Sequence, residues 1–337
     1  MPIAANLIIL LMVALGSCFG QDANDAIESA PRETKPIQRI AIIGASASAG
    51  FGVVVEQVEV DTEQYSKTML NMKDLLAAAD GPEELVYLDL SSFLFFSRPR
   101  EFGRSAVDRI LQWEPELVFG VDFLFWFTFG VIPEEKRLDF LEIGLSMLDE
   151  IAATGVPMVI GEVPDLEGIK SFVISSRQIP KRSTVIKANQ RINEWADKRP
   201  NVAVVPLQRL TDQLSQGSSI TVGAHQWDPG KDGISMIAVD KLHPTFDGMI
   251  CLVQAMEVAA RSIKAPVRQL PPLELDRDAL MKKMRVRRLK PRRRESALGY
   301  RTHRFLLDFL ASRLRSRFWS RSVVASSRAA STAGRTA

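Results

Sequence analysis

Residues 40–50 read IAIIGASASAG, a short run of β-branched and small apolar residues that ends in a glycine followed by serines. Such a run is typical of a buried strand that leads directly into a turn. Ser46 comes two residues after Gly44 and is therefore expected just beyond the carboxyl end of this strand. In open α/β sheets, that end is where ligands bind. The stretch predicts a sheet whose first strand presents a serine at a site.

Further apolar runs alternate with helix-like segments along the chain. Strands are expected at 85–90, 117–121, 156–161 and 202–207, and helices at 62–79, 104–112, 134–153, 184–197 and 246–263. This alternation is typical of a parallel sheet covered by helices on both faces. We predict a three-layer α/β/α sandwich with a five-stranded parallel sheet of flavodoxin-like type.

A second motif lies far from the first in the sequence. Residues 239–248 read VDKLHPTFDG, in which Asp240 precedes His243 by three residues. A carboxylate beside a histidine can hold the imidazole in one tautomer while its other nitrogen takes a proton from a nucleophile. Ser46 as nucleophile, His243 as general base and Asp240 as orienting carboxylate would complete a triad. The simpler alternative for Ser46 is a serine in a turn or at a helix N-cap.

The two motifs together resemble the SGNH or GDSL hydrolase family, whose first block is Gly-Asp-Ser and whose last block is Asp-x-x-His. The corresponding residues are Gly44-Ala45-Ser46 and Asp240-Lys241-Leu242-His243. The early serine and the closely spaced Asp and His differ from α/β-hydrolases, where the serine lies in G-x-S-x-G. The resemblance implies an α/β/α sandwich and ester hydrolysis by a Ser-His-Asp triad.

The same resemblance implies three oxyanion donors, at Ser46, Ser91 and Asp122. The family has an asparagine at the last of these positions, and an aspartate where this chain has Ala45. An ionised carboxylate only accepts hydrogen bonds. Either burial keeps Asp122 protonated, so that it can donate, or the oxyanion hole is impaired.

The substrate pocket is expected beside the aromatic segment 119–129. Phe123 and Trp126 are its candidate walls, with core packing as the alternative, and His225 from the Gly-rich segment 217–234 is a third candidate. No two of the three histidines are spaced as metal ligands, so neither a metal nor another cofactor is expected.

The N-terminus has the layout of a secretory signal peptide. Residues 7–15 form a nine-residue apolar run followed by small and then polar residues. We predict a signal peptide at 1–20, a linker at 21–36, and export to the periplasm, the cell envelope or the medium. The alternatives are a retained membrane anchor and a lipoprotein with its lipid on Cys18.

The C-terminal part of the chain is strongly basic. Residues 281–337 carry 17 of the 43 Lys and Arg residues but only two acidic residues, Glu295 and Asp308. Because prolines follow position 265, we predict a hydrolase-like domain at 37–265 and a tail at 266–337. The tail is either unstructured or a basic amphipathic helix on an anionic membrane or polymer. Its charge would also suit nucleic acid, but an exported protein would not meet that partner.

The sequence therefore predicts an exported serine hydrolase acting on a small-molecule or glycan ester. Esterase, lysophospholipase-like and carbohydrate deacetylase activities all fit these residues. An O-acyltransferase acting on an envelope polysaccharide would use the same triad. A catalytically inactive binding module of the same fold is the third alternative, and it is favoured by Ala45 and Asp122.

Overall fold

The computed structural model describes residues 36–58, 64–80, 85–169, 171, 173–265 and 268–287. The predicted signal peptide, nearly all of the predicted linker, and the predicted tail beyond residue 287 lie outside these residues. Within the described part, no helix is both long and apolar enough to cross a membrane.

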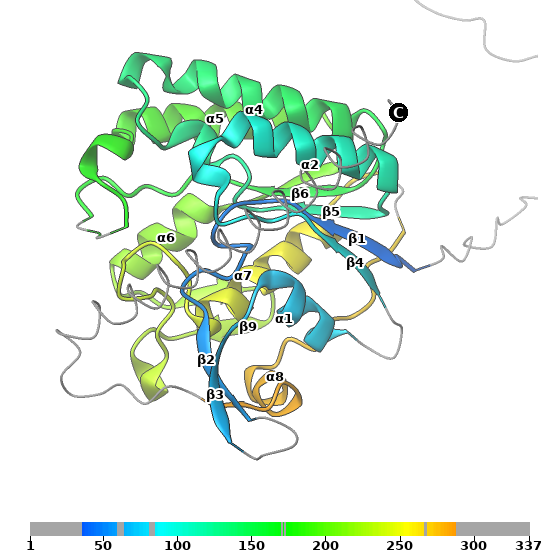
Figure 1. Cartoon of the computed structure of the whole chain (residues 1–337), viewed down its shortest axis with the longest axis vertical. Helices are drawn as coiled ribbons and strands as arrows, with labels where there is room; N and C mark the ends of the chain where they lie inside the picture. The colour runs from blue at the N-terminus through cyan, green and yellow to red at the C-terminus, as the bar shows by residue number, and fades with distance from the viewer. Residues whose placement is uncertain are drawn as a thin grey trace, which may run out of the picture. The chain divides into compact units, whose positions relative to one another are not determined.

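A five-stranded parallel sheet lies at the centre of the fold (Figure 1). Its strands are β1 (Arg39–Ile42), β4 (Val86–Asp89), β5 (Leu117–Gly120), β6 (Met158–Gly161) and β7 (Val202–Val205), in the spatial order β4-β1-β5-β6-β7. The order reverses at β1, as in flavodoxin-like folds. The predicted fold class is therefore confirmed.

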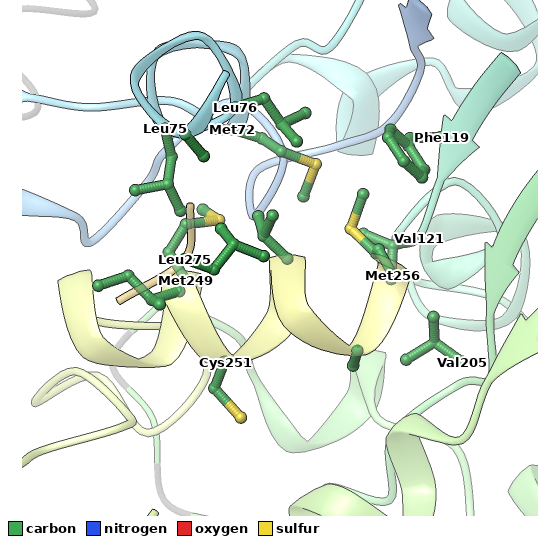
Figure 2. Close-up of a cluster of buried hydrophobic side chains, with 14 of the residues drawn as sticks. Met72, Leu75, Leu76, Phe119, Val121, Val205, Met249, Cys251, Met256 and Leu275 are labelled. Carbon is green, nitrogen blue, oxygen red and sulfur yellow. The ribbon is translucent and has the colours of Figure 1, made fainter. Parts of the chain in front are cut away.

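Helices cover both faces of this sheet (Figure 1). One face carries α2 (Pro99–Trp113), the short α3 (Phe125–Thr128), α4 (Arg137–Ala152) and α5 (Arg182–Asp197), and the other carries α1 (Met72–Ala79) and α7 (Phe246–Arg261). Alternate residues of β1 and of the position after it face opposite sides of the sheet: Ile40 and Ile42 join the cluster with α1 and α7, whereas Ala41 and Ile43 join the cluster with α2 and α4. Figure 2 shows the first cluster, where Met72 and Leu75 of α1 lie above α7.

The remaining elements are short. They comprise α6 (Leu207–Ser215), the antiparallel hairpin β8 (Ile220–Val222) and β9 (His225–Trp227), and the 3₁₀ turns η1 (Phe95–Ser97), η2 (Glu134–Lys136), η3 (Ser176–Gln178) and η4 (Lys231–Gly233). A separate three-stranded antiparallel sheet has the order β10-β2-β3, with β2 (Val54–Val58), β3 (Tyr65–Met69) and β10 (Val286–Arg287).

The helix predicted at 62–79 is wrong in its first part. Residues Tyr65–Met69 form β3, which pairs along its whole length with β2, and the helix begins only at Met72. Asn71 accepts a hydrogen bond from the amide of Asp74, whose side chain accepts one from the amide of Asn71. This capping box sets the start of α1.

The packed body also extends beyond the predicted boundary at 265. Leu270, Leu275, Leu280 and Val286 are buried in the same cluster as α1 and α7. Leu280 lies on a further helix, α8 (Arg277–Lys283), which is capped by Asp276. Helix α7 ends at Arg261, before the prolines that follow residue 265, and the leucines beyond those prolines still pack into the core.

We expect Leu280→Ala to lower the free energy of unfolding by about 2–5 kcal/mol, because it removes a fully buried side chain. Lys282→Ala, on an exposed position of the same helix, should change it by at most about 0.5 kcal/mol. Urea denaturation measures both. Equal stability of the two variants would contradict the packing of α8.

Candidate active site

The predicted triad residues come together in the structure. His243 Nε2 lies 2.8 Å from Ser46 Oγ, and His243 Nδ1 lies 2.8 Å from Asp240 Oδ2. Ser46 is in the turn after β1, and the other two residues are in the loop before α7. Asp240 and His243 are buried, whereas Ser46 is partly exposed. The three side chains therefore form one hydrogen-bonded chain that ends at an accessible hydroxyl.

The three-residue spacing in this loop has a geometric reason. Asp240 Oδ1 accepts hydrogen bonds from the amides of Leu242, at 2.9 Å, and His243, at 3.0 Å, which leaves Oδ2 for the imidazole. Lys241 takes a left-handed conformation, with φ of 61°, to close the turn. One carboxylate thus shapes the loop and orients the ring.

Burial tends to raise the pKa of Asp240. The hydrogen bond and the positive charge of the His243 side chain, together with the hydrogen bonds from the amides of His243 and Leu242, outweigh this effect. The pKa of Asp240 therefore lies below its usual value. Asp240 is therefore ionised at neutral pH, and its Oδ2 favours a proton on His243 Nδ1. In the tautomer with its proton on Nδ1, Nε2 can accept the Ser46 proton.

This shift predicts a pH-dependent contribution to stability. Because the folded-state pKa is lowered, the contribution is fully present above about pH 5 and is lost as the pH falls through the unfolded and then the folded value. The stability advantage of the wild type over Asp240→Asn should therefore shrink between about pH 5 and pH 2. Urea unfolding of both proteins across this range measures it, and an advantage that stays constant would contradict the shift.

An aromatic contact also holds the imidazole. The ring of Phe51 lies against His243, with 4.3 Å between the ring centroids, and Phe93 packs edge-on against Phe51 at 6.0 Å. Phe51 belongs to the same turn as the nucleophile, since its amide donates to the carbonyl of Ser46. Sequence reasoning missed Phe51, whose one available signal was its position just after the serine-rich turn.

Asp122 holds the turn that carries Ser46. Its Oδ1 accepts from the amide of Ala45, at 3.0 Å, and from Ser48 Oγ, at 2.6 Å; its Oδ2 accepts from the amides of Ala47, at 2.9 Å, and Ser48, at 3.2 Å. A Cβ atom on Gly44 would lie 2.0 Å from Asp122 Oδ1, so this approach requires glycine.

This geometry corrects the oxyanion role expected for Asp122. Burial raises the pKa of Asp122 above its usual value, although the bonds from Ser48, Ala45 and Ala47 oppose the rise. Both of its oxygens receive N–H groups, so the side chain acts as an acceptor. Asp122 supplies, from the turn after β5, a supporting carboxylate that Ala45 does not provide.

Ser91 also differs from its expected role. Its amide and its hydroxyl both donate to Asp89 Oδ1, at 2.9 and 2.6 Å, so its N–H is already engaged. The amide of Ser46 is different, because Asp122 accepts from positions 45, 47 and 48 but not from position 46. Of the three predicted donors, the Ser46 amide is the one that the geometry favours.

We expect Asp122→Asn to lower the free energy of unfolding by about 1–3 kcal/mol and to slow any turnover at Ser46. The reason is that the amide nitrogen of asparagine would face N–H donors that the carboxylate now satisfies. Asp139→Asn, which removes an exposed carboxylate from α4, is the matched control. A variant of Asp122 that is as stable as the wild type and faster would restore the oxyanion interpretation.

A cavity of about 130 Å³ lies beside the triad. Ser46, Asp122 and His243 line it together with mostly aliphatic side chains, including Leu207, Leu210 and Leu214 of α6. Sequence reasoning missed these leucines, although their spacing is that of one helix face.

The predicted pocket residues do not line this cavity. Phe123 packs against Phe95 and Phe127 in the core under α2 and α4, and Trp126 is buried in the same cluster. Their neighbour Phe125 does line the cavity, whereas His225 is exposed on β9 and does not. The core-packing alternative therefore describes Phe123 and Trp126.

Among the described residues, no group of three or more His, Cys, Asp or Glu side chains is placed to hold a metal ion.

Neither models of protein families nor curated proteins match this chain. Among solved structures, it is similar to Axe2, an acetylxylan esterase from Geobacillus stearothermophilus, at 14% identity and a TM-score of 0.45, over 68% of this chain and 96% of that chain. It is also similar to LAE5, an alpha/beta hydrolase enzyme from the metagenome of Lake Arreo, Spain, at 13% identity and a TM-score of 0.42, over 68% and 97% of the two chains. At such low identity and score, these likenesses do not indicate what this chain acts on.

Proposed function

We propose that this chain is a serine hydrolase that cleaves carboxylic esters. The observation that carries the proposal is the continuous chain from Asp240 through His243 to Ser46, with 2.8 Å at each of its two links. A hydroxyl placed against a neutral imidazole that a carboxylate orients is an activated nucleophile. The adjoining cavity gives a substrate a place to bind.

In the proposed reaction, Ser46 Oγ attacks the ester carbonyl carbon while its proton passes to His243 Nε2. Asp240 stabilises the imidazolium that forms. The proton then goes to the leaving alcohol, and the acyl group stays on Ser46. His243 next takes a proton from water, which attacks the acyl carbon; the bond to Ser46 Oγ breaks, His243 returns the proton to Oγ, and the carboxylic acid leaves.

The proposed oxyanion donor within the nucleophile turn is the amide of Ser46. Because Asp122 is an acceptor, it does not replace the asparagine donor that the SGNH pattern would supply at its position. One missing donor typically costs ~3 kcal/mol, or roughly a hundredfold in rate. We therefore expect modest turnover, seen best with esters of good leaving groups.

The apolar run at 7–15 supports the further proposal that the protein is exported. An O-acyltransferase would share the acyl-Ser46 step and differ in its acceptor, so transfer to an added alcohol in place of water would identify it.

We expect Ser46→Ala to lose at least about a thousandfold in hydrolysis of 4-nitrophenyl butyrate, together with labelling by a fluorophosphonate probe, because both need the activated hydroxyl. Ser97→Ala, at an exposed serine on η1, should keep both activities. Thermal melting should be similar for the two variants. The proposal would be refuted if the wild-type protein neither reacts with the probe nor hydrolyses the ester, or if Ser46→Ala is still labelled.

A further inference from the structure

The cavity beside Ser46 has a mostly aliphatic lining, part of which comes from two helices. Leu207, Leu210 and Leu214 come from successive turns of α6, and Cys251 and Leu252 come from α7. Figure 2 shows Cys251 leaving α7 on the side away from Met72 and Leu75. Burial raises the pKa of the Cys251 thiol to about 12, so it is neutral and contributes an apolar surface.

Besides the triad residues and Asp122, the lining contains the polar side chains of Glu162 and Thr211, and both already have hydrogen-bond partners within the protein. The oxygens of Glu162 accept from Asn193 Nδ2, at 3.0 Å, and from the amide of Gln208, at 3.2 Å. The hydroxyl of Thr211 donates to the carbonyl of Leu207 at 2.8 Å. A sugar hydroxyl placed here would lose water and gain few new partners, which is costly. A hydrocarbon chain has no such need.

The size of the cavity limits the length of that chain. A cavity of about 150 Å³ lined by Leu, Ile and Phe holds one benzene molecule, which has six carbon atoms. The present cavity, at about 130 Å³, is slightly smaller. An acetyl group would leave most of it unfilled, and a long fatty acyl chain would not fit inside it.

We infer that the substrate is an ester of an aliphatic acid of about four to six carbon atoms, whose acyl chain fills this cavity. The inference rests on the proposed serine hydrolase, because the acyl carbon must bond to Ser46, which lines the same cavity. The acyl part stays on the enzyme between the two half-reactions, so it is the part that a cavity next to Ser46 Oγ retains.

The test is a series of 4-nitrophenyl esters from acetate to decanoate. Each methylene buried in the cavity should raise kcat/KM about fourfold, so hexanoate, with four more methylenes, should exceed acetate by about 250-fold, with no further gain from octanoate onward. A second series, acetates of methanol through hexanol, should show no comparable rise. A maximum at acetate, a steady rise to decanoate, or a dependence on alcohol length would overturn the inference while leaving the hydrolase intact.

Blocking variants test the location. Leu214→Trp and Leu252→Phe, both at partly buried positions of the lining, should each lower the ratio of hexanoate to acetate hydrolysis at least tenfold. Ile186→Trp, at an exposed position on α5, should leave this ratio unchanged. If a folded blocking variant keeps the wild-type ratio, the acyl chain lies elsewhere.

A binding measurement separates failure of this inference from failure of the proposed function. Ser46→Ala should bind methyl hexanoate more tightly than methyl acetate in calorimetry, and adding Leu214→Trp should remove the difference. If these binding differences are found but the wild type hydrolyses no ester, the proposed hydrolase is refuted and the apolar binding site is supported. Equal binding of the two esters would refute the apolar site itself.

Discussion

The placement of Ser46 depends on the carboxylate of Asp122. Strands β1 and β5 are parallel neighbours, and Ile42 lies opposite Phe119, so the turns that follow the two strands lie beside each other at the same edge of the sheet. Asp122 can therefore reach the turn after β1 and accept hydrogen bonds from residues on both sides of the serine. Without this acceptor, three N–H groups of a tight turn would lack a buried partner, and the distance from Ser46 to His243 would no longer be fixed.

The two carboxylates of the site have similar geometry but different electrostatics. Each carboxylate accepts hydrogen bonds from backbone amides. Burial raises the pKa of Asp122, whereas His243 helps to lower the pKa of Asp240. The difference follows from the partners: a ring that can become a cation lies against Asp240, whereas Asp122 has only neutral donors. Asp240 is therefore suited to stabilise a positive charge on His243 during a reaction, and Asp122 is suited to hold the backbone of the turn that carries Ser46.

The sequence predicted the parts of this structure that follow from local patterns. Alternating apolar runs define the sheet, and Ser46, Asp240 and His243 were found because a turn or a three-residue spacing places them. Phe123, Trp126 and Phe125 show the limit of this reasoning: all lie in one aromatic run, and only the start of α3 decides which of them faces the core and which the cavity. Asp122 was interpreted either as a protonated oxyanion donor or as the mark of an impaired oxyanion hole, because its acceptor role depends on the turn after β1, which no local pattern places beside it.

The pairing of β10 with β2 joins Val286 to Gln57, residues from opposite ends of the described chain. Contacts between such distant segments form slowly, because a long loop must close before they contribute. During synthesis, β2 would have one edge unpaired until the ribosome has released nearly the whole described body, and unpaired edges invite association with other chains. His243 also emerges long after Ser46, so a growing chain carries its serine for most of translation without the base that would activate it.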